Sequence, residues 1–341
     1  MSAKLKWGIL ATGGIARKFA AGLRDSRTSR LAAVGSRTVE AARDFAAEFD
    51  GVRAQGSYEA LLADPEVAVV YIATPHPSHL EWAVKAAEAG KHILCEKPLA
   101  LNRAGAERMI AAARAQRVFF MEAFIYRCHE QTDRLAALVA GGTLGELRAI
   151  HSTFTVNFKF DSAHRIFNKA LGGGGILDLG CYPLSFVRRI AGAALGQTFA
   201  EPLSLQGAGR LNAVTGADEF AAATLAFPRG ITAQISCGTC VPLGVGARLF
   251  FSAGWIDVPS PFHPGHPEMP GNVVAHRTHA APENLALTET RSLYTLEADA
   301  VANAIARGEL ECAAMTHADS LGNMAALDAW RAAIGMRYEG E

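Results

Sequence analysis

Residues 5–25 read LKWGILATGGIARKFAAGLRD, an apolar run that enters a glycine-containing turn and continues with apolar residues three or four positions apart. The apolar run predicts a β-strand, and the later spacing predicts an amphipathic helix. The same change of periodicity recurs over about the first 125 residues. Alternating strands and helices are typical of a doubly wound α/β domain with a parallel sheet.

Further strands are expected at RLAAVGS (30–36), VAVVYIAT (67–74), KHILCE (91–96) and VFFMEA (118–123), with helices at 39–49, 78–90 and 102–116. The stretch at 67–74 is apolar almost throughout, as expected for a strand that is buried on both faces of a parallel sheet. These elements assign residues 1–124 to one α/β domain.

The pattern changes from about residue 144, where strand-like stretches follow one another at 147–158, 219–227, 231–237 and 247–258. FPRG at 227–230 marks a hairpin-style break. Helical periodicity returns at 296–308 and 319–334, and residues 259–290 are expected to form a long loop. We therefore predict a second domain, residues 125–341, of α+β type on a mostly antiparallel sheet.

The bulk composition limits the possible partners. At 341 residues the chain exceeds the usual size of one hydrophobic core, which supports two domains. Its 33 basic and 33 acidic residues balance, so no nucleic-acid or anionic-membrane partner is expected. With no secretory signal and no run of about 18 apolar residues, a cytoplasmic protein with six reduced cysteines is expected.

The turn ATGGIA at 11–16 matches a dinucleotide-binding fingerprint in part, because its three glycine positions hold Ala11, Gly13 and Ala16. The central glycine is the one that lets the backbone approach a pyrophosphate. The turn joins the first strand to the first helix, so cofactor contacts are predicted for Ala11, Thr12, Gly13, Gly14 and Ile15. The alternative is a tight turn that binds nothing.

The second strand ends in VGSRT, where an NAD site usually offers an acid about 20 residues after the glycines. Here Ser36, Arg37 and Thr38 supply a guanidinium and two hydroxyls and no carboxylate. These groups suit a ribose 2′-phosphate, so NADP(H) is predicted in preference to NAD(H). The alternative is an exposed arginine at a strand end.

Five further motifs run along the chain: ATPHPSH (73–79), CEKPLALN (95–102), MEAFIYRCH (121–129), LGGGGILDLGCYPL (171–184) and DSLGNMAALDAWR (319–331). Together they resemble the Gfo/Idh/MocA oxidoreductases over essentially the whole chain. The likeness is nearest to the branch of glucose–fructose oxidoreductase, dimeric dihydrodiol dehydrogenase and NADP-dependent sugar dehydrogenases. The resemblance implies a Rossmann domain, an open-faced sheet domain that serves for homodimerisation, and catalysis at their junction.

The resemblance carries the family's lysine onto Lys97 and its catalytic tyrosine onto Tyr182, and it suggests a cis bond between Lys97 and Pro98. A free phenol has a pKa near ~10, and a neighbouring ammonium favours the phenolate, so such a pair can exchange a proton with a substrate oxygen. Asp178 lies four residues before Tyr182, on the same face of a helix that begins near Ile176, and could orient a substrate hydroxyl. The alternative is a tyrosine packed in the core and an aspartate that caps its own helix.

Gly172–Gly175 precede this helix, although glycine loses more backbone freedom on folding than any other residue. We hypothesise that the missing side chains let the backbone pass close to nicotinamide and substrate, with helix N–H groups facing the ligand.

Other residues are assigned from their positions. Thr74, Pro75, His76, His79, Glu96 and Lys97 are expected to line the cofactor site. Arg127 is expected to contact the substrate or to brace the two domains. CGTC at 237–240 is interpreted as ordinary thiols, and the histidines of HPGH (263–266) and HRTH (276–279) are not expected to bind a metal.

The sequence therefore predicts an NADP(H)-dependent oxidoreductase that interconverts a secondary alcohol and a carbonyl on a sugar or related cyclic polyol. Its substrate site is assigned to Lys97, Arg127, Asp178 and Tyr182. A trans-dihydrodiol dehydrogenase and a non-catalytic nucleotide-binding regulator on the same fold are the alternatives.

Overall fold

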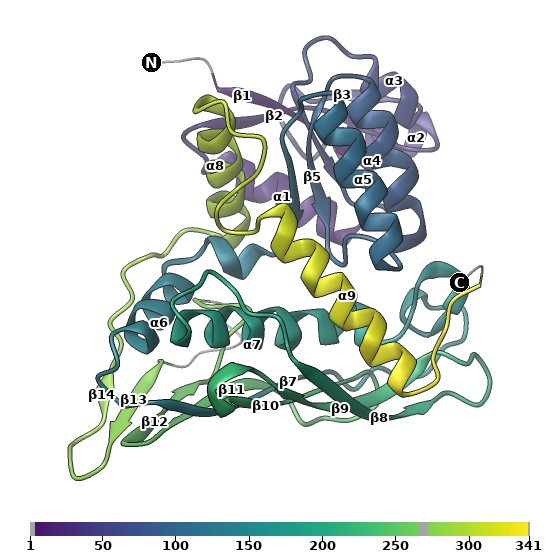
Figure 1. The fold of residues 1–341 in the computed structure, drawn as a ribbon. Helices are drawn as coiled ribbons and strands as arrows, with labels where there is room; N and C mark the ends of the chain where they lie inside the picture. Colours follow the sequence, from purple (N-terminus) through teal and green to yellow (C-terminus); the bar gives the residue numbers. More distant parts are fainter. Residues whose placement is uncertain (1–3, 266–271, 340–341) are drawn as a thin grey trace. The chain divides into compact units, whose positions relative to one another are not determined.

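The computed structural model describes residues 4–265 and 272–339, which fall into two compact units (Figure 1). The first unit comprises residues 1–128 and 291–321, and the second comprises residues 129–290 and 322–341.

The first unit is built on a six-stranded sheet in the order β3-β2-β1-β4-β5-β6, in which all neighbouring strands are parallel. The strands are β1 (Leu5–Leu10), β2 (Ser29–Gly35), β3 (Arg53–Gln55), β4 (Val69–Ile72), β5 (His92–Glu96) and β6 (Phe120–Ala123). This is the strand order of dinucleotide-binding doubly wound sheets, so the predicted Rossmann fold is confirmed.

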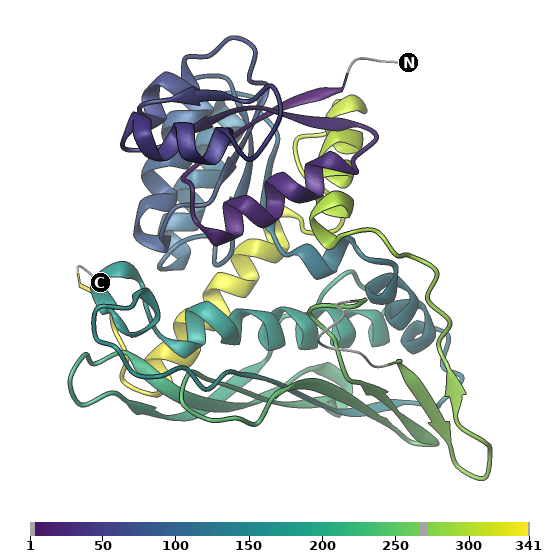
Figure 2. The same cartoon turned by 180° about the vertical axis from the view of Figure 1, so that it is seen from behind.

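Helices cover both faces of this sheet (Figures 1 and 2). They are α1 (Gly14–Arg24), α2 (Val39–Ala46), α3 (Tyr58–Leu62), α4 (His79–Glu88), α5 (Arg103–Ala115) and α8 (Leu293–Ala306). α1 buries Ala16, Phe19 and Leu23, because residues three and four positions apart share one face of a helix. The Phe19 ring stacks on Tyr71 of β4 with 4.0 Å between the ring centroids, which fixes α1 against the sheet.

Residues 291–321 pack on α1, although they follow most of the second unit in the sequence. Thr295 donates a hydrogen bond to the Gly22 carbonyl at 2.7 Å, and Asp299 accepts one from Ser26 at 2.6 Å. The domain boundary predicted at residues 124/125 places this segment in the second domain. The sequence could not show otherwise, because helical periodicity does not reveal which sheet a helix covers.

The second unit contains an eight-stranded sheet in the order β14-β13-β12-β11-β7-β10-β9-β8. β7 and β10 are parallel and the other neighbouring pairs are antiparallel, so the predicted mostly antiparallel sheet is confirmed. The strands are β7 (Leu147–Thr155), β8 (Ser204–Leu211), β9 (Asp218–Ala226), β10 (Thr232–Gly238), β11 (Val245–Phe251), β12 (Gly254–Val258), β13 (Val274–Arg277) and β14 (Glu283–Asn284). β13 and β14 lie inside the stretch 259–290, so the prediction of one long loop there was wrong.

The helices α6 (Glu130–Ala140) and α7 (Cys181–Ala194) and the C-terminal part of α9 (His317–Ala333) lie on one face of this sheet (Figure 1). No helix of the described residues covers the other face (Figure 2). Short helical turns complete the two units at His76–Ser78, Ile125–Cys128, Arg165–Phe167, Lys169–Leu171, Ile176–Gly180 and Pro228–Gly230.

Within the described part of the chain, one helical stretch, Lys169–Ala194, is long and apolar enough to cross a membrane. However, 89% of its most apolar window is buried inside the protein, and α7 packs on β7 and β10. We interpret it as the core helix of the second unit.

Candidate active site

The turn between β1 and α1 leaves the N-terminus of α1 open. Its N-cap, Gly13, has no capping side chain, and no acidic residue lies in the first turn of the helix. A Cβ added to Gly13 or Gly14 would meet no atom of the described chain within 4 Å. Ala11 adopts φ +86°, a left-handed conformation at the position where the fingerprint has its first glycine. Open amide groups and the helix dipole suit a pyrophosphate, so this turn fits a dinucleotide.

The end of β2 brings together the three residues predicted to bind a 2′-phosphate. Ser36 is buried, whereas Arg37 is exposed and makes no hydrogen bond or ion pair with a described residue. The Thr38 hydroxyl accepts a hydrogen bond from the Ala41 N–H at 3.3 Å and caps α2. Arg37 is therefore the available cation at this strand end.

Lys97 follows β5 in a turn whose backbone is held by buried side chains. Glu122 accepts a hydrogen bond from the Leu99 N–H at 2.9 Å, and Glu96 is 8% exposed. Lys97 itself is partly exposed, and its bond to Pro98 is cis, which confirms the suggestion from the resemblance. The lysine is presented at the carboxyl end of the parallel sheet, where ligands of such sheets bind.

His79 joins this turn to the turn after β4. It is fully buried, and its ring nitrogens lie 2.8 Å from the Thr74 carbonyl oxygen and 3.1 Å from that of Pro98. Burial lowers the pKa of His79 to about 4, so the ring is neutral at physiological pH. We correct the prediction that His79 lines the cofactor site, because the ring is fully buried and both of its nitrogens face backbone carbonyl oxygens. Cofactor contacts of Thr74, Pro75 and His76 stay predictions.

Arg127 is also occupied within its own unit. Its side chain is 1% exposed, pairs with Asp319, and donates from Nε to the Ala314 carbonyl at 3.0 Å. A guanidinium buried in this way has no surface for a substrate. We therefore correct its assignment as a substrate residue and give it a packing role in the first unit.

In the second unit, Asp178 lies in the helical segment that leads into α7. Ile176–Gly180 form one turn of π-helix and α7 follows directly, so a helix begins near Ile176 as predicted. Arg165 donates to both oxygens of Asp178, at 3.0 and 3.2 Å. The carboxylate is buried and held in one orientation by this bidentate ion pair. The sequence analysis missed Arg165, which no motif marks.

Tyr182 lies four residues later among aromatic rings. Its ring centroid is 5.3 Å from Phe154, 5.4 Å from Phe262 and 6.1 Å from His263. The residue is 7% exposed. Asp178 and Tyr182 are thus brought together on one helical segment, as predicted.

The glycine run is explained by packing within the second unit. A Cβ on Gly173 would lie 2.4 Å from the Arg165 carbonyl oxygen, and a Cβ on Gly174 would lie 2.2 Å from Oδ1 of Asp218. The Ile176 N–H donates to Oδ2 of Asp218 at 2.6 Å. We therefore correct the hypothesis that these glycines make room for nicotinamide, with helix N–H groups facing a ligand. Atoms of Arg165 and Asp218 fill the space beside the glycines, and the Ile176 N–H faces Asp218 instead of a ligand.

The described histidines of the second unit form no candidate metal site. Among the described residues no group of three or more His, Cys, Asp or Glu side chains could hold a metal ion. His263 packs near Tyr182, whereas His276 stacks on Trp255 with 4.6 Å between the ring centroids. His266 lies outside the described residues.

Two family models match these two folds. The oxidoreductase family with an NAD-binding Rossmann fold matches residues 5–124, and the Gfo/Idh/MocA C-terminal domain matches residues 132–257. The chain belongs to the Gfo/Idh/MocA oxidoreductase family. Its first match contains the dinucleotide turn and Lys97, and its second contains Asp178 and Tyr182.

Three similar proteins illustrate the likeness. A trans-1,2-dihydrobenzene-1,2-diol dehydrogenase from Bos taurus is 37% identical over 241 residues, which are 70% of this chain and 69% of that one. A D-xylose 1-dehydrogenase (NADP(+)) from Hypocrea jecorina is 35% identical over 245 residues, 66% and 62% of the two chains. The crystal structure of a 3-ketoreductase from Actinomadura kijaniata with NADP and TDP-benzene has a TM-score of 0.83 at 28% identity, covering 98% and 99% of the two chains.

Proposed function

We propose that this oxidoreductase uses NADP(H) to interconvert a secondary alcohol and a carbonyl on a sugar or related cyclic polyol. Tyr182 acts as the general acid/base with Lys97 as its electrostatic partner, and Asp178 orients a substrate hydroxyl. The proposal rests above all on the helical segment in which Arg165 locks the Asp178 carboxylate four residues before the phenol of Tyr182.

The cofactor assignment is supported by the charge at the end of β2. Arg37 is exposed and has no ion-pair partner among the described residues, and VGSRT contains no acid to repel a phosphate. Two of the relatives carry NADP in their names or crystals. When bound, the nicotinamide supplies or accepts the hydride.

The chain's own residues then manage the proton and the substrate. When an alcohol is oxidised its hydroxyl proton must leave, and a phenolate at Tyr182 is a base that can take it and return it in the reverse direction. The ammonium of Lys97 favours that phenolate. A carboxylate with fixed orientation at Asp178 accepts a hydrogen bond from a hydroxyl, which suits a substrate that carries several.

The aromatic surroundings of Tyr182 favour a second candidate, the oxidation of trans-dihydrodiols. The rings of Phe154 and Phe262 make the surroundings of the tyrosine apolar, which suits an unsaturated carbocycle at the phenol. The relative from Bos taurus is named for this activity.

A substrate panel separates these candidates. The purified protein is assayed with NADP+ and aldoses, inositols, trans-1,2-cyclohexanediol and trans-dihydrobenzenediol, while NADPH binding is followed by its fluorescence. Turnover of aldoses or inositols with the best kcat/KM supports the first candidate, and preference for the dihydrodiol supports the second. NADPH binding without turnover of any compound would contradict both and support a non-catalytic regulator.

Arg37→Ala tests the cofactor assignment. Loss of a charge-assisted bond to a phosphate costs about 1.5–3 kcal/mol, so NADP(H) affinity is expected to fall roughly ten- to a hundredfold while NAD(H) affinity changes little. Arg30→Ala, at the other end of β2 and also exposed, is the matched control. Equal losses for both cofactors would show that Arg37 does not contact the 2′-phosphate.

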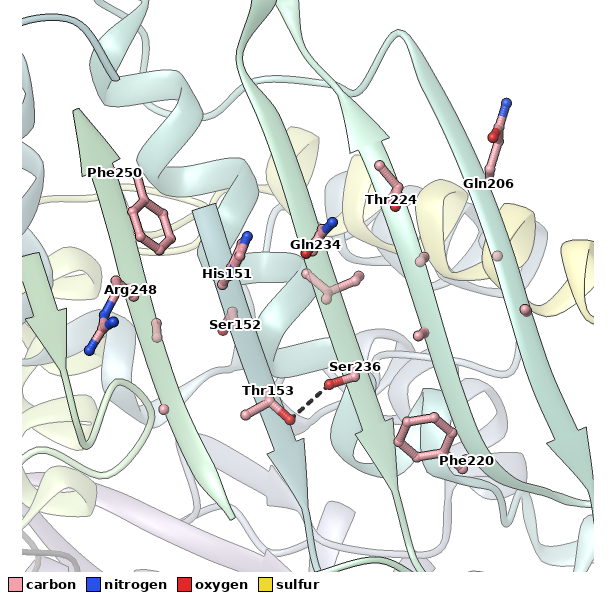
Figure 3. Close-up of a pocket in the computed structure, with 17 residues that line it drawn as sticks. His151, Ser152, Thr153, Gln206, Phe220, Thr224, Gln234, Ser236, Arg248 and Phe250 are labelled. Atoms are coloured by element: carbon pink, nitrogen blue, oxygen red, sulfur yellow. Dashed lines mark hydrogen bonds between the residues drawn. The ribbon is translucent and has the colours of Figure 1, made fainter. Parts of the chain in front are cut away.

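We also propose that the chain forms a homodimer through the uncovered face of its eight-stranded sheet. Figure 3 shows Thr153, Gln206, Phe220, Thr224 and Gln234 on this face. Most of these side chains are polar and no helix of the described residues covers them, so a second sheet can pack on this face. The cytoplasmic location expected from the sequence stays a prediction.

A further inference from the structure

We propose that Asp218, at the start of β9, is a positioning residue that holds the glycine run and thereby sets the geometry of Asp178 and Tyr182. The inference deepens the function proposed above and rests on it.

The Asp218 carboxylate is built into the first turn of the helical segment. The residue is 1% exposed, and its Oδ2 accepts a hydrogen bond of 2.6 Å from the Ile176 N–H. The Gly175 N–H also faces the carboxylate. An anion that receives the first amides of a helical segment stabilises that turn through both hydrogen bonds and the dipole.

The glycines and the carboxylate fit one another. A Cβ on Gly174 would lie 2.2 Å from Oδ1 of Asp218, and a Cβ on Gly175 would lie 3.2 Å from Oδ2. Gly174 also adopts φ +137°, which other residues rarely tolerate. The carboxylate therefore fills the space that side chains would take, and the run cannot move toward β9.

The C-terminal segment holds the same run from another direction. The Tyr338 hydroxyl donates to the Gly173 carbonyl at 3.0 Å, and the Arg331 guanidinium lies 4.9 Å from the centroid of the Tyr338 ring.

Two contacts pass this position on to the site. The Asp178 N–H donates to the Gly174 carbonyl at 3.2 Å, so a shift of Gly174 displaces the Asp178 backbone directly. The position of a Gly173 Cβ lies 2.4 Å from the carbonyl oxygen of Arg165, whose guanidinium holds the Asp178 carboxylate. Both residues of the Asp178–Arg165 ion pair are thus in contact with the glycines that Asp218 fixes.

The charge of Asp218 matters for this role. Burial raises the pKa of Asp218 to about 6, while the amides of Ile176 and Gly175 and the charge of Arg331 on α9 oppose that rise. The other titratable groups beside it are the buried Cys237 thiol of β10 and the Tyr338 hydroxyl. Protonation near pH 6 would weaken the bond to Ile176, because a neutral carboxyl is a poorer acceptor.

Kinetics of Asp218→Asn and Asp218→Ala test the proposal, with Glu219→Gln as the matched control. Glu219 is the next residue of β9 and bonds Asn212 and Arg210 instead of the glycine run. We expect kcat to fall about tenfold for the asparagine and up to about a hundredfold for the alanine, since small misplacements of reacting groups have effects of this size. The affinity for NADPH is expected to stay unchanged. In the parent, kcat is expected to fall below about pH 6 as Asp218 is protonated, and this fall is expected to disappear in Asp218→Asn.

The outcomes separate this inference from the proposed function. The role of Asp218 alone would be overturned if Asp218→Asn kept the kcat of the parent and its decrease below about pH 6 while Tyr182→Phe lost activity. A Tyr182→Phe enzyme that stays active would instead overturn the proposed chemistry. If the Asp218 variants do not fold, Tyr338→Phe serves instead, because it removes the hydrogen bond to the Gly173 carbonyl without changing a buried charge. A kcat several-fold below that of the parent supports the inference, and a parent-like kcat overturns it.

Discussion

Asp178 takes its orientation from Arg165, which lies thirteen residues before it in the chain. The arginine side chain is 41% exposed and the aspartate side chain 7% exposed, so the carboxylate is the partner that needs the ion pair. In Arg165→Met the carboxylate loses both hydrogen bonds, and kcat/KM is expected to fall at least about tenfold.

Arg165→Lys is the control for charge alone. It keeps the cation but cannot donate two parallel bonds, so its loss of kcat/KM is expected to lie between those of the parent and Arg165→Met. Steady-state kinetics and melting curves check both variants. Arg165→Met within twofold of the parent would mean that Asp178 does not act on the substrate.

The residues that the sequence proposed for the site and those that it did not propose differ in how local their signals are. Lys97, Asp178 and Tyr182 stand in short motifs that can be recognised from neighbouring residues alone. Arg165 and Asp218 make pairings that only the fold creates, since Asp218 meets Ile176 across 42 positions. His79 and Arg127 were misassigned because a motif position does not reveal whether the side chain turns toward the ligand or into the core.

At the level of elements, the first unit was predictable because each of its buried strands is a compact apolar run. β8 was missed because SLQGAGRL contains two glycines and is mostly exposed, so it shows no alternation of apolar and polar residues. α6 was missed as well, although Leu135, Ala136 and Val139 give it an apolar face. The edge strands β13 and β14 exist through pairing with β12, which no local pattern shows.

Two buried groups on different elements give opposite responses to acid. Burial lowers the pKa of His79 from 6.5 to about 4, so the stability that its neutral ring contributes is present above about pH 6.5 and is lost as the pH falls toward 4. Burial raises the pKa of Asp218 from 3.8 to about 6, so its contribution is present below about pH 4 and is lost as the pH rises through 6.

We therefore expect opposite trends in two variants between pH 7 and pH 4.5. Relative to the parent, the free energy of unfolding should rise on acidification for His79→Gln and fall for Asp218→Asn, by at most about 3 kcal/mol each. Urea melts of both units at the two pH values measure these differences. Trends of the same sign, or no trend, would show that the burial of one group does not control its titration.

For the whole molecule, the uncovered sheet face predicts how copies of the chain associate. Thr224 is exposed there, opposite Gln234 in the register of β9 and β10. An arginine at this position would place an unpaired charge in the middle of a sheet-on-sheet interface. Thr224→Arg is therefore expected to run as a monomer in sedimentation, whereas the parent and the control Gln116→Arg, an exposed position of the first unit, run as dimers. A parent that is monomeric, or a dimeric Thr224→Arg, would contradict this interface.

The proposed chemistry requires both Lys97 and Tyr182. Lys97→Ala removes the positive charge and Tyr182→Phe removes the phenol oxygen. If the two residues act together in one proton transfer, the double variant should lose little more kcat than the less active single variant. Fully additive losses would contradict the pairing.

The most direct test is kcat of Tyr182→Phe with the best substrate of the panel. The substitution removes one oxygen from a packed ring, so the melting temperature and the NADPH affinity should stay near those of the parent. Tyr126→Phe, which removes the hydroxyl of a buried tyrosine in the first unit, is the control. General acid–base groups contribute about 10²–10⁴-fold, and we expect kcat to fall by a factor in that range. A Tyr182→Phe enzyme that turns over within a few-fold of the parent would show that the proton takes another route.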